Sequence, residues 1–394
     1  MKLPVPKLKS KKLSNDGKGY LIIDITKRTV KVLFISEQNN QKNVVGVSVK
    51  DLPENGDKRP FIQSAIEDCF IQAGAKTSKA IIGLGGPDVF GFILITKIQR
   101  DNPDKKISEN EMEDVYSKIR NASYKQAKNI RNTFYADDIE FETLDLVVTS
   151  FSINDEIVTD PVGLTGEYLQ TSIYCSYSEK KFYDDIINTL QKAEVHAIAV
   201  TTTLYSQVKL LSEDDKNFIL VDIGKTYTDF AVIFGKNIIQ TRSFEMGGDF
   251  FSQFLADKMN LDKNTANGKK EAYALGTLPA DQVDDVGDYL YEAGKYWRMA
   301  FSSILGSMTG IKSLPRKIIL SGGGAYLSVL QELLFDEEWR NAIPFSGDLE
   351  IEITSSEKWE KHVNDELKVL SGPRMFVTST LAIVKRELEE EENE

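Results

Sequence analysis

The sequence is poor in the residues that bind zinc or form disulfides. Its 394 residues include two cysteines, Cys69 and Cys175, and two histidines, His196 and His362. A zinc site with four such ligands would need all of them, and their spacing contains no CxxC or HxxxH pair. Two cysteines also exclude a disulfide framework, which is consistent with a reducing cytoplasm. We therefore expect neither a structural zinc site nor a disulfide-stabilised fold.

Long apolar runs and an excess of positive charge are also absent. The longest apolar segments, such as Gly91–Ile95 and Phe218–Val221, have the length of strands, so none predicts a membrane span. No apolar signal sequence follows the early lysines, and residues 1–18 are interpreted as a basic disordered tail, with weak attachment to an anionic membrane or partner as the alternative. Sixty acidic residues against 48 basic ones disfavour nucleic-acid binding.

What is present is an α/β pattern that starts twice. Apolar runs in Gly19–Ile35 predict two strands around a turn at Asp24, followed by a third strand and a helix over Pro60–Ala73. The same order returns at Phe218–Gly224, where the turn begins with Asp222. This repeat places Asp24 opposite Asp222 in two related half-domains.

A segment of different character interrupts the first half. A capping box at Ser108–Glu111 predicts the start of a helix, and Asp145–Ile153 predicts a strand. The segment closes at the turn-rich Asp160–Gly166, and the α/β pattern resumes with a strand over Tyr168–Ser176.

Three turns have the composition of a nucleotide site. Asp24–Thr29 and Asp222–Asp229 each join two predicted strands, and Leu320–Ala325 places three glycines between a strand and a helix. Glycines let backbone N–H groups approach phosphates closely, and the carboxylates can hold a hydrated Mg²⁺. Each turn alone is a weak signal, but their order along the chain predicts a nucleotide site.

In this combination the sequence resembles the actin/Hsp70/sugar-kinase ATPase superfamily and, within it, the FtsA family of bacterial cell-division proteins. The resemblance extends from about Gly19 to Leu388, and Asp160–Gly166 is similar to the family's segment at the end of an inserted subdomain. The residues that match the family's second phosphate turn are Asp222, Ile223, Gly224, Thr228 and Asp229, and those that match near the adenine are Ala266 and Lys270, whereas Asn267 replaces a glutamate.

The resemblance implies an α/β, actin-like ATPase fold of two related RNase H-like domains with an inserted α+β subdomain. The implied first domain comprises residues 19–86, 167–216 and 355–388, the insertion residues 87–166, and the second domain residues 217–354. An acidic tail over residues 389–394 completes the chain.

The resemblance also implies that ATP and Mg²⁺ bind between the three turns, with at most slow hydrolysis and no catalytic residue assigned. Asp24 and Asp222 would hold Mg²⁺ through water. The implied cofactor-binding residues are Asp24, Thr29, Lys31, Asp222, Gly224, Thr228, Asp229, Lys270, Gly322, Gly323 and Gly324.

The two phosphate turns depart from the family pattern. Thr26 replaces a glycine, which predicts strain if the backbone needs a positive φ there. In the second turn, bulkier residues at 225–227 replace small ones. Lys27, Arg28 and Lys225 could compensate by pairing with phosphate oxygens, and the alternative is a pocket that has lost its ligand.

The function implied by the resemblance is that of a bacterial cytoskeletal adaptor. It would form filaments with itself and link the C-terminal tail of FtsZ, received around Phe250–Arg298, to other division proteins. The place would be the cytoplasmic face of the inner membrane at the division site. FtsA usually ends in an amphipathic helix, but Glu389–Glu394 would be repelled by anionic lipid. Membrane contact is therefore expected only indirectly or through a helix absent from this sequence.

Three alternatives use the same superfamily. A PilM-like cytoplasmic scaffold of type IV pilus assembly shares the inserted subdomain and comes second. A metabolite kinase would need a carboxylate base facing a substrate pocket, and none is evident. An Hsp70-like chaperone is disfavoured because no substrate-binding β domain follows the ATPase region.

Overall fold

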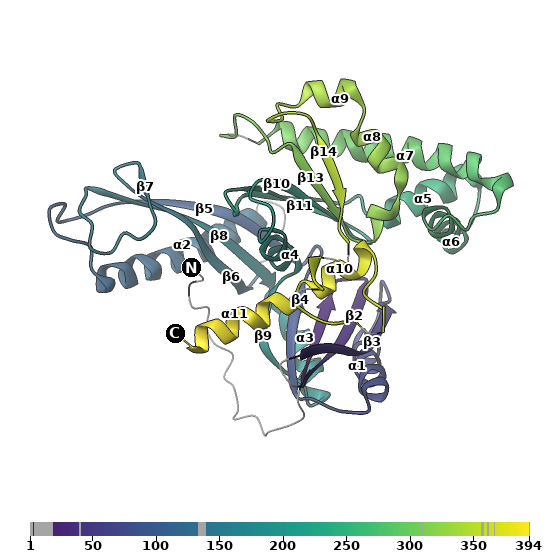
Figure 1. The fold of residues 1–394 in the computed structure, drawn as a ribbon, viewed down its shortest axis with the longest axis horizontal. Helices are drawn as coiled ribbons and strands as arrows, with labels where there is room; N and C mark the ends of the chain where they lie inside the picture. The colour runs from purple at the N-terminus through teal and green to yellow at the C-terminus, as the bar shows by residue number, and fades with distance from the viewer. Residues whose placement is uncertain are drawn as a thin grey trace.

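The described residues form three β-sheets, two of which repeat one topology (Figure 1). The computed structural model describes residues 3, 19–38, 41–132, 139–308, 310–355, 358–360, 362–365 and 367–393. No helix in these ranges is long and apolar enough to cross a membrane.

The first sheet has the strand order β3-β2-β1-β4-β9. Strands β1 to β3 are antiparallel neighbours, whereas β4 and β9 run parallel to β1. Side chains alternate along β1, so Leu21 and Ile23 face α1 and α3 while Tyr20 and Ile22 face α4 and the C-terminal helices. The elements are β1 (Gly19–Ile25), β2 (Thr29–Gln38), β3 (Gln41–Asp51), α1 (Arg59–Ala73), β4 (Lys79–Leu84), α3 (Lys180–Lys192), β9 (His196–Thr202) and α4 (Thr203–Leu211).

The second sheet repeats this order as β12-β11-β10-β13-β14. Asp24 and Asp222 therefore occupy the same place, one residue before the end of the central strands β1 and β10. The elements are β10 (Phe218–Ile223), β11 (Thr228–Phe234), β12 (Asn237–Phe244), α5 (Gly248–Met259), α6 (Lys263–Ala274), α7 (Ala280–Gly306), β13 (Lys317–Ser321), η1 (Gly323–Tyr326), α8 (Ser328–Leu334), α9 (Glu337–Ala342) and β14 (Glu350–Ile353).

One apolar core joins the two lobes. Tyr205 and Leu211 of α4 and Phe376 of α10 (Pro373–Ser379) are buried in a cluster with Ile22 of the first sheet and Leu220 of the second. The helices between the sheets thus contact both lobes (Figure 1).

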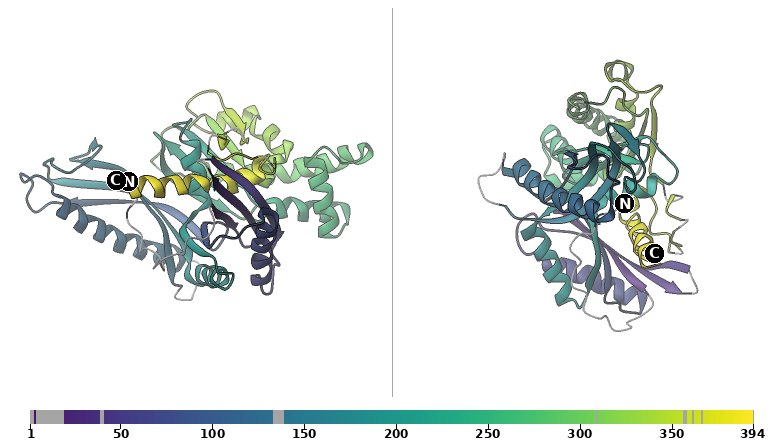
Figure 2. Two further views of the ribbon diagram at one scale, coloured as in Figure 1. Left: turned by 60° about the horizontal axis from the view of Figure 1, so that its bottom comes forward. Right: turned by 90° about the vertical axis from the view of Figure 1, so that its left-hand side faces the viewer.

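The third sheet forms the insertion, with strand order β5-β8-β6-β7. Its elements are β5 (Val89–Gln99), α2 (Glu109–Asn132), β6 (Phe141–Ile153), β7 (Glu156–Val158) and β8 (Tyr168–Glu179). The insertion projects from the lobes as an arm, with α2 along one face of its sheet (Figure 2, left).

The insertion ends later than the sequence predicted. We assigned Tyr168–Ser176 to the first domain, but β8 is hydrogen-bonded to β5 on one side and β6 on the other. The turn at residues 160–166 therefore precedes a strand inside the insertion rather than closing it. An apolar strand pattern does not reveal which sheet the strand joins, and this is the physical reason for the error.

The insertion is bonded to both lobes. The carboxylate of Asp145 on β6 is buried and accepts hydrogen bonds from Thr201 Oγ1 at 2.7 Å and from the Thr202 N–H at 3.1 Å, both in the first lobe. Thr241 Oγ1 of the second lobe donates to the Gly91 carbonyl at 2.8 Å.

The described parts of both predicted tails contact the rest of the chain. Leu3 is buried against the insertion, and its N–H donates to the Leu146 carbonyl at 2.7 Å, so this residue is not part of a free tail. The rest of residues 1–18 lies outside the described residues. At the other end, α11 (Ala382–Asn393) continues through the predicted acidic tail because Glu389 pairs with Lys42 at 3.2 Å and with Lys385 one helical turn earlier.

The ends of the insertion predict where it can be removed. The Glu179 N–H donates to the Asp88 carbonyl at 2.8 Å, so joining Asp88 directly to Glu179 needs little rearrangement. We expect this deletion to unfold cooperatively, at a lower temperature than the full chain because the Asp145 hydrogen bonds are lost. Deletion of residues 88–165 leaves β8 without partners and should aggregate. Thermal circular dichroism and gel filtration of both variants test the boundary, and the reverse ranking would contradict it.

Candidate functional site

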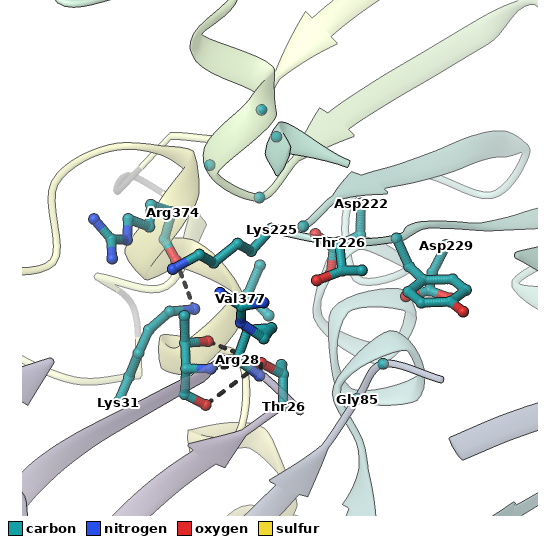
Figure 3. Close-up of a pocket in the computed structure, with 18 of the residues that line it drawn as sticks. Thr26, Arg28, Lys31, Gly85, Asp222, Lys225, Thr226, Asp229, Arg374 and Val377 are labelled. Atoms are coloured by element: carbon teal, nitrogen blue, oxygen red, sulfur yellow. Dashed lines mark hydrogen bonds between the residues drawn. The ribbon is translucent and has the colours of Figure 1, made fainter. Parts of the chain in front are cut away.

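A cleft of about 390 Å³ lies between the two lobes where the three predicted turns meet. Figure 3 shows Thr26, Arg28 and Lys31 with Arg374 on one side, and Asp222, Thr226 and Asp229 on the other. The predicted site residues that line the cleft are Asp24, Thr29, Lys31, Asp222, Gly224, Asp229, Lys270, Gly322, Gly323 and Gly324. Thr228 does not line it.

Asp24 is buried, and only one of its two carboxylate oxygens accepts hydrogen bonds from the described residues. Its Oδ2 accepts hydrogen bonds from Lys31 Nζ and Thr378 Oγ1, both at 2.8 Å. Lys31 Nζ also donates to the Arg374 carbonyl at 3.2 Å, which joins β2 to α10. The Oδ1 atom is buried and has no hydrogen-bond partner among the described residues. Water on a metal ion in the cleft would supply the missing donor.

The carboxylate of Asp222 is positioned by a hydrogen bond from a glutamine side chain. Gln207 Nε2 on α4 donates to Asp222 Oδ2 at 2.8 Å, and Ser321 Oγ donates to Gln207 Oε1 at 2.6 Å. Burial raises the pKa of the Asp222 carboxyl to about 6, although the Gln207 hydrogen bond and the charge of Lys31 oppose the shift. The sequence analysis missed Gln207 because no local motif connects this helix residue with either turn.

The two carboxylates fit a magnesium ion bound through water. No group of three or more histidine, cysteine, aspartate or glutamate side chains in the described part of the chain could enclose a metal. Mg²⁺ commonly uses one or two carboxylates together with substrate phosphates and keeps several waters. Asp24 and Asp222 would supply those carboxylates from opposite lobes, and the ion would draw the lobes and a polyphosphate together.

The three glycines after β13 have different roles. Gly322 adopts a φ of 78°, and a side chain there would collide with Asp222 Oδ1. A side chain at Gly324 would collide with Ile223. At Gly323 the nearest atom to a Cβ would be Arg374 Cγ at 3.9 Å, so a side chain fits. The fold itself needs Gly322 and Gly324, whereas only a ligand needs Gly323.

The first turn is closed by a threonine hydroxyl. Thr26 does not adopt a positive φ, so the strain predicted for a threonine at this position is absent. Its Oγ1 accepts from the Thr29 N–H at 3.0 Å and from the Arg28 N–H at 3.3 Å. A threonine hydroxyl commonly closes a turn in this way.

Two of the three predicted cations have carboxylate partners, whereas no ion pair is found for Lys27 in the described part of the chain. Arg28 pairs with Glu54 at 2.9 Å, and Lys225 pairs with Asp51 at 3.1 Å across the cleft. Both pairs are partly exposed to solvent. A phosphate would therefore have to displace Glu54 or Asp51 to bind these side chains, which is a small cost because exposed ion pairs contribute little.

Two of the predicted ligands have structural partners. Lys270 Nζ donates to Gly248 O, Ser252 Oγ and Asn267 Oδ1 within 3.0 Å, and burial lowers the pKa of its ammonium to about 8. All three protons are thus committed, and Lys270 joins α6 to α5. Thr228 Oγ1 donates to the Met246 carbonyl and accepts from Trp297 Nε1, which explains why it lies outside the cleft.

Comparison with known proteins gives two groups of similar proteins. The family model described as type IV pilus assembly protein PilM matches residues 186–344. The cell-division protein FtsA of Streptococcus pneumoniae is 25% identical over 79% of this chain and 72% of its own length. FtsA of Enterococcus hirae is 23% identical over 80% of this chain and 75% of its own length.

Among solved structures, a PilM–PilN type IV pilus biogenesis complex is similar with a TM-score of 0.63 at 16% identity. The match covers 93% of this chain and 98% of that chain. A diol dehydratase-reactivating factor in nucleotide-free form has a TM-score of 0.50 at 11% identity, over 94% of this chain and 100% of that chain.

The repeated sheets, the cleft between them and these structural likenesses define an actin-like ATPase fold, as the sequence predicted. Within that class, the particular protein that the sequence resembles is FtsA. The similar FtsA sequences confirm this resemblance at 22 to 25% identity.

Gly323 offers a test of the cleft that spares the fold. In Gly323→Leu the side chain would occupy the space beside Arg374, and we expect nucleotide affinity to fall at least a hundredfold. Gly306→Leu is the matched control, because a Cβ there meets no atom within 4 Å and the residue does not line the cleft. Isothermal titration with Mg-ADP and Mg-ATP, beside thermal unfolding, separates lost binding from lost stability. Unchanged affinity in Gly323→Leu would contradict the site.

The pKa of Asp222 predicts how binding depends on pH. Above about pH 6 the carboxylate is mostly ionised and can hold metal-bound water, and below it the ionised fraction falls, approaching tenfold per pH unit. We expect the Mg²⁺-dependent part of nucleotide binding to weaken about fivefold from pH 6 to pH 5. The same pH titration of Asp222→Asn serves as the control, because it reports the pH dependence that comes from protonation of the nucleotide itself. This variant should bind the nucleotide weakly and show no additional loss of affinity between pH 6 and pH 5. An equal loss of affinity in both proteins would exclude Asp222 as its source.

Proposed function

We propose that this chain is an FtsA-like protein of bacterial cell division. It binds ATP with Mg²⁺ in the cleft, assembles into actin-like filaments, and links the C-terminal tail of FtsZ to other division proteins. The observation that carries the proposal is the similarity to FtsA sequences over about 80% of the chain. The two facing carboxylates and the open space at Gly323 support the nucleotide part.

Self-assembly through the insertion is supported by its apolar surface. Ile95 on β5, Ile157 on β7, and Val162 and Leu164 in the following turn are all exposed. Exposed aliphatic side chains on a projecting arm are suited to contact with another copy of the chain.

The proposed surface for the FtsZ tail lies on the second lobe around Phe250–Arg298. Leu275 at the end of α6, and Val283 and Tyr296 on α7, are exposed large apolar residues within this range. A short peptide could bury these side chains, with Lys258 and Lys295 nearby in sequence to attract acidic groups. The proposed location is the cytoplasmic face of the inner membrane at the division site, with membrane attachment either indirect or through a helix absent from this sequence.

A second candidate is a PilM-like cytoplasmic scaffold of type IV pilus assembly. It is favoured by the TM-score of 0.63 to the chain from a PilM–PilN complex and by the PilM family model over residues 186–344. Both candidates use the same fold and insertion, so the partner peptide decides between them.

A peptide titration distinguishes the two functions. Fluorescently labelled peptides from the FtsZ C-terminus and the PilN N-terminus are titrated with the full chain, and anisotropy is recorded. We expect saturable binding of the FtsZ peptide, with at least tenfold weaker binding of the PilN peptide. Tyr296→Glu should weaken the FtsZ peptide about tenfold, while Ile71→Glu, at an exposed residue on α1, should leave it unchanged. Preferential binding of the PilN peptide would establish the second candidate instead.

A further inference from the structure

The two phosphate turns differ in what their backbone N–H groups do. In the first turn, the N–H groups of Arg28 and Thr29 both donate to Thr26 Oγ1, and the Thr26 N–H donates to the Thr29 carbonyl at 2.9 Å. The hydroxyls of Thr26 and Thr29 also lie 2.9 Å apart. Two N–H groups of this turn, those of Arg28 and Thr29, are therefore occupied by Thr26 Oγ1, although Thr26 to Thr29 line the cleft.

In the second turn, the backbone carbonyls accept hydrogen bonds from the start of α5, whereas two N–H groups remain available within the ranges that the structure describes. Its carbonyls accept from the start of α5, where the N–H groups of Gly247, Gly248 and Asp249 donate to Thr226, Gly224 and Lys225 respectively, at 2.7 to 2.9 Å. In the described part of the chain, the N–H groups of Lys225 and Thr226 have no hydrogen-bond partner. Thr226 Oγ1 is also buried without a partner beside the cleft.

A phosphate oxygen would therefore meet different surfaces on the two sides. At the second turn it would find unused donors, which are worth most when the acceptor is charged. At the first turn, the N–H groups of Arg28 and Thr29, from which a phosphate oxygen would otherwise accept, already donate to Thr26 Oγ1. Of the three predicted cations at the cleft, Arg28 and Lys225 must first give up Glu54 and Asp51, and Lys27 offers a point charge that does not replace two oriented backbone donors.

We propose that Thr26 determines phosphate specificity by occupying the donors of the first turn with its own hydroxyl. The cleft then binds a nucleoside diphosphate on the second turn and gains little from a third phosphate. This inference rests on the proposed nucleotide binding and deepens it. Thr26 acts as an internal competitor of the terminal phosphate, rather than as a ligand for it.

The inference predicts a gain of affinity from a substitution in the binding site. Thr26→Val keeps the shape of the side chain but removes the acceptor, so the N–H groups of Arg28 and Thr29 become available to a phosphate. We expect wild-type affinities for Mg-ADP and Mg-ATP to lie within about threefold of each other. In Thr26→Val, Mg-ATP should bind about tenfold more tightly, as expected for charge-assisted hydrogen bonds, while Mg-ADP changes little. Thr26→Ser keeps the hydroxyl and should match the wild type.

Isothermal titration of the three full-length proteins with both nucleotides decides the matter, and thermal unfolding reports their folding. Wild-type affinity for Mg-ATP more than tenfold above that for Mg-ADP overturns the inference without any variant. So does a Thr26→Val protein that is folded but binds both nucleotides more weakly. Binding by Thr26→Val alone supports the role of Thr26 but contradicts nucleotide binding by the natural chain. Absence of binding in every protein overturns both proposals.

Discussion

The ion pair between Lys31 and Asp24 is the interaction on which the base of the cleft depends. Asp24 and Asp222 are buried and face the same space from two lobes, and burying two like charges without compensation is strongly unfavourable. Lys31 neutralises Asp24 at 2.8 Å and also opposes the rise in the pKa of Asp222. Their other partners, Thr378 and Gln207, come from α10 and α4. The helices of the shared core are thus also the helices that orient the carboxylates.

Much of this arrangement could be predicted because it is local in sequence or repeated. Strands β1 and β2 lie where the apolar runs of Gly19–Ile35 predicted two strands, and the repeated strand order placed Asp24 opposite Asp222. Gln207 and Thr378 could not be predicted, since each meets its carboxylate only through the packing of α4 and α10 between the sheets. The error at β8 has a similar origin, because its pairing with β5 and β6 is a property of three dimensions.

The first turn shows a different limit of sequence reasoning. The replacement of a glycine by Thr26 predicted backbone strain, whereas the turn avoids a positive φ and closes on the new hydroxyl. The threonine therefore alters the hydrogen bonding of the turn without requiring a positive φ. The second turn kept Gly224 and its support from α5, so two copies of one motif now present different chemistry to a common cleft.

The attachment of the insertion has a mechanical consequence. Asp145 joins the arm to the end of β9 in the first lobe, while Gly91 joins it to β12 in the second. An opening of the lobes must therefore either break the hydrogen bond at Gly91 or rotate the arm about Asp145. Because the arm projects far beyond these two attachments, a small rotation at its base produces a larger displacement at β7, near its tip (Figure 1). A change in the angle between the two lobes would therefore also move the insertion.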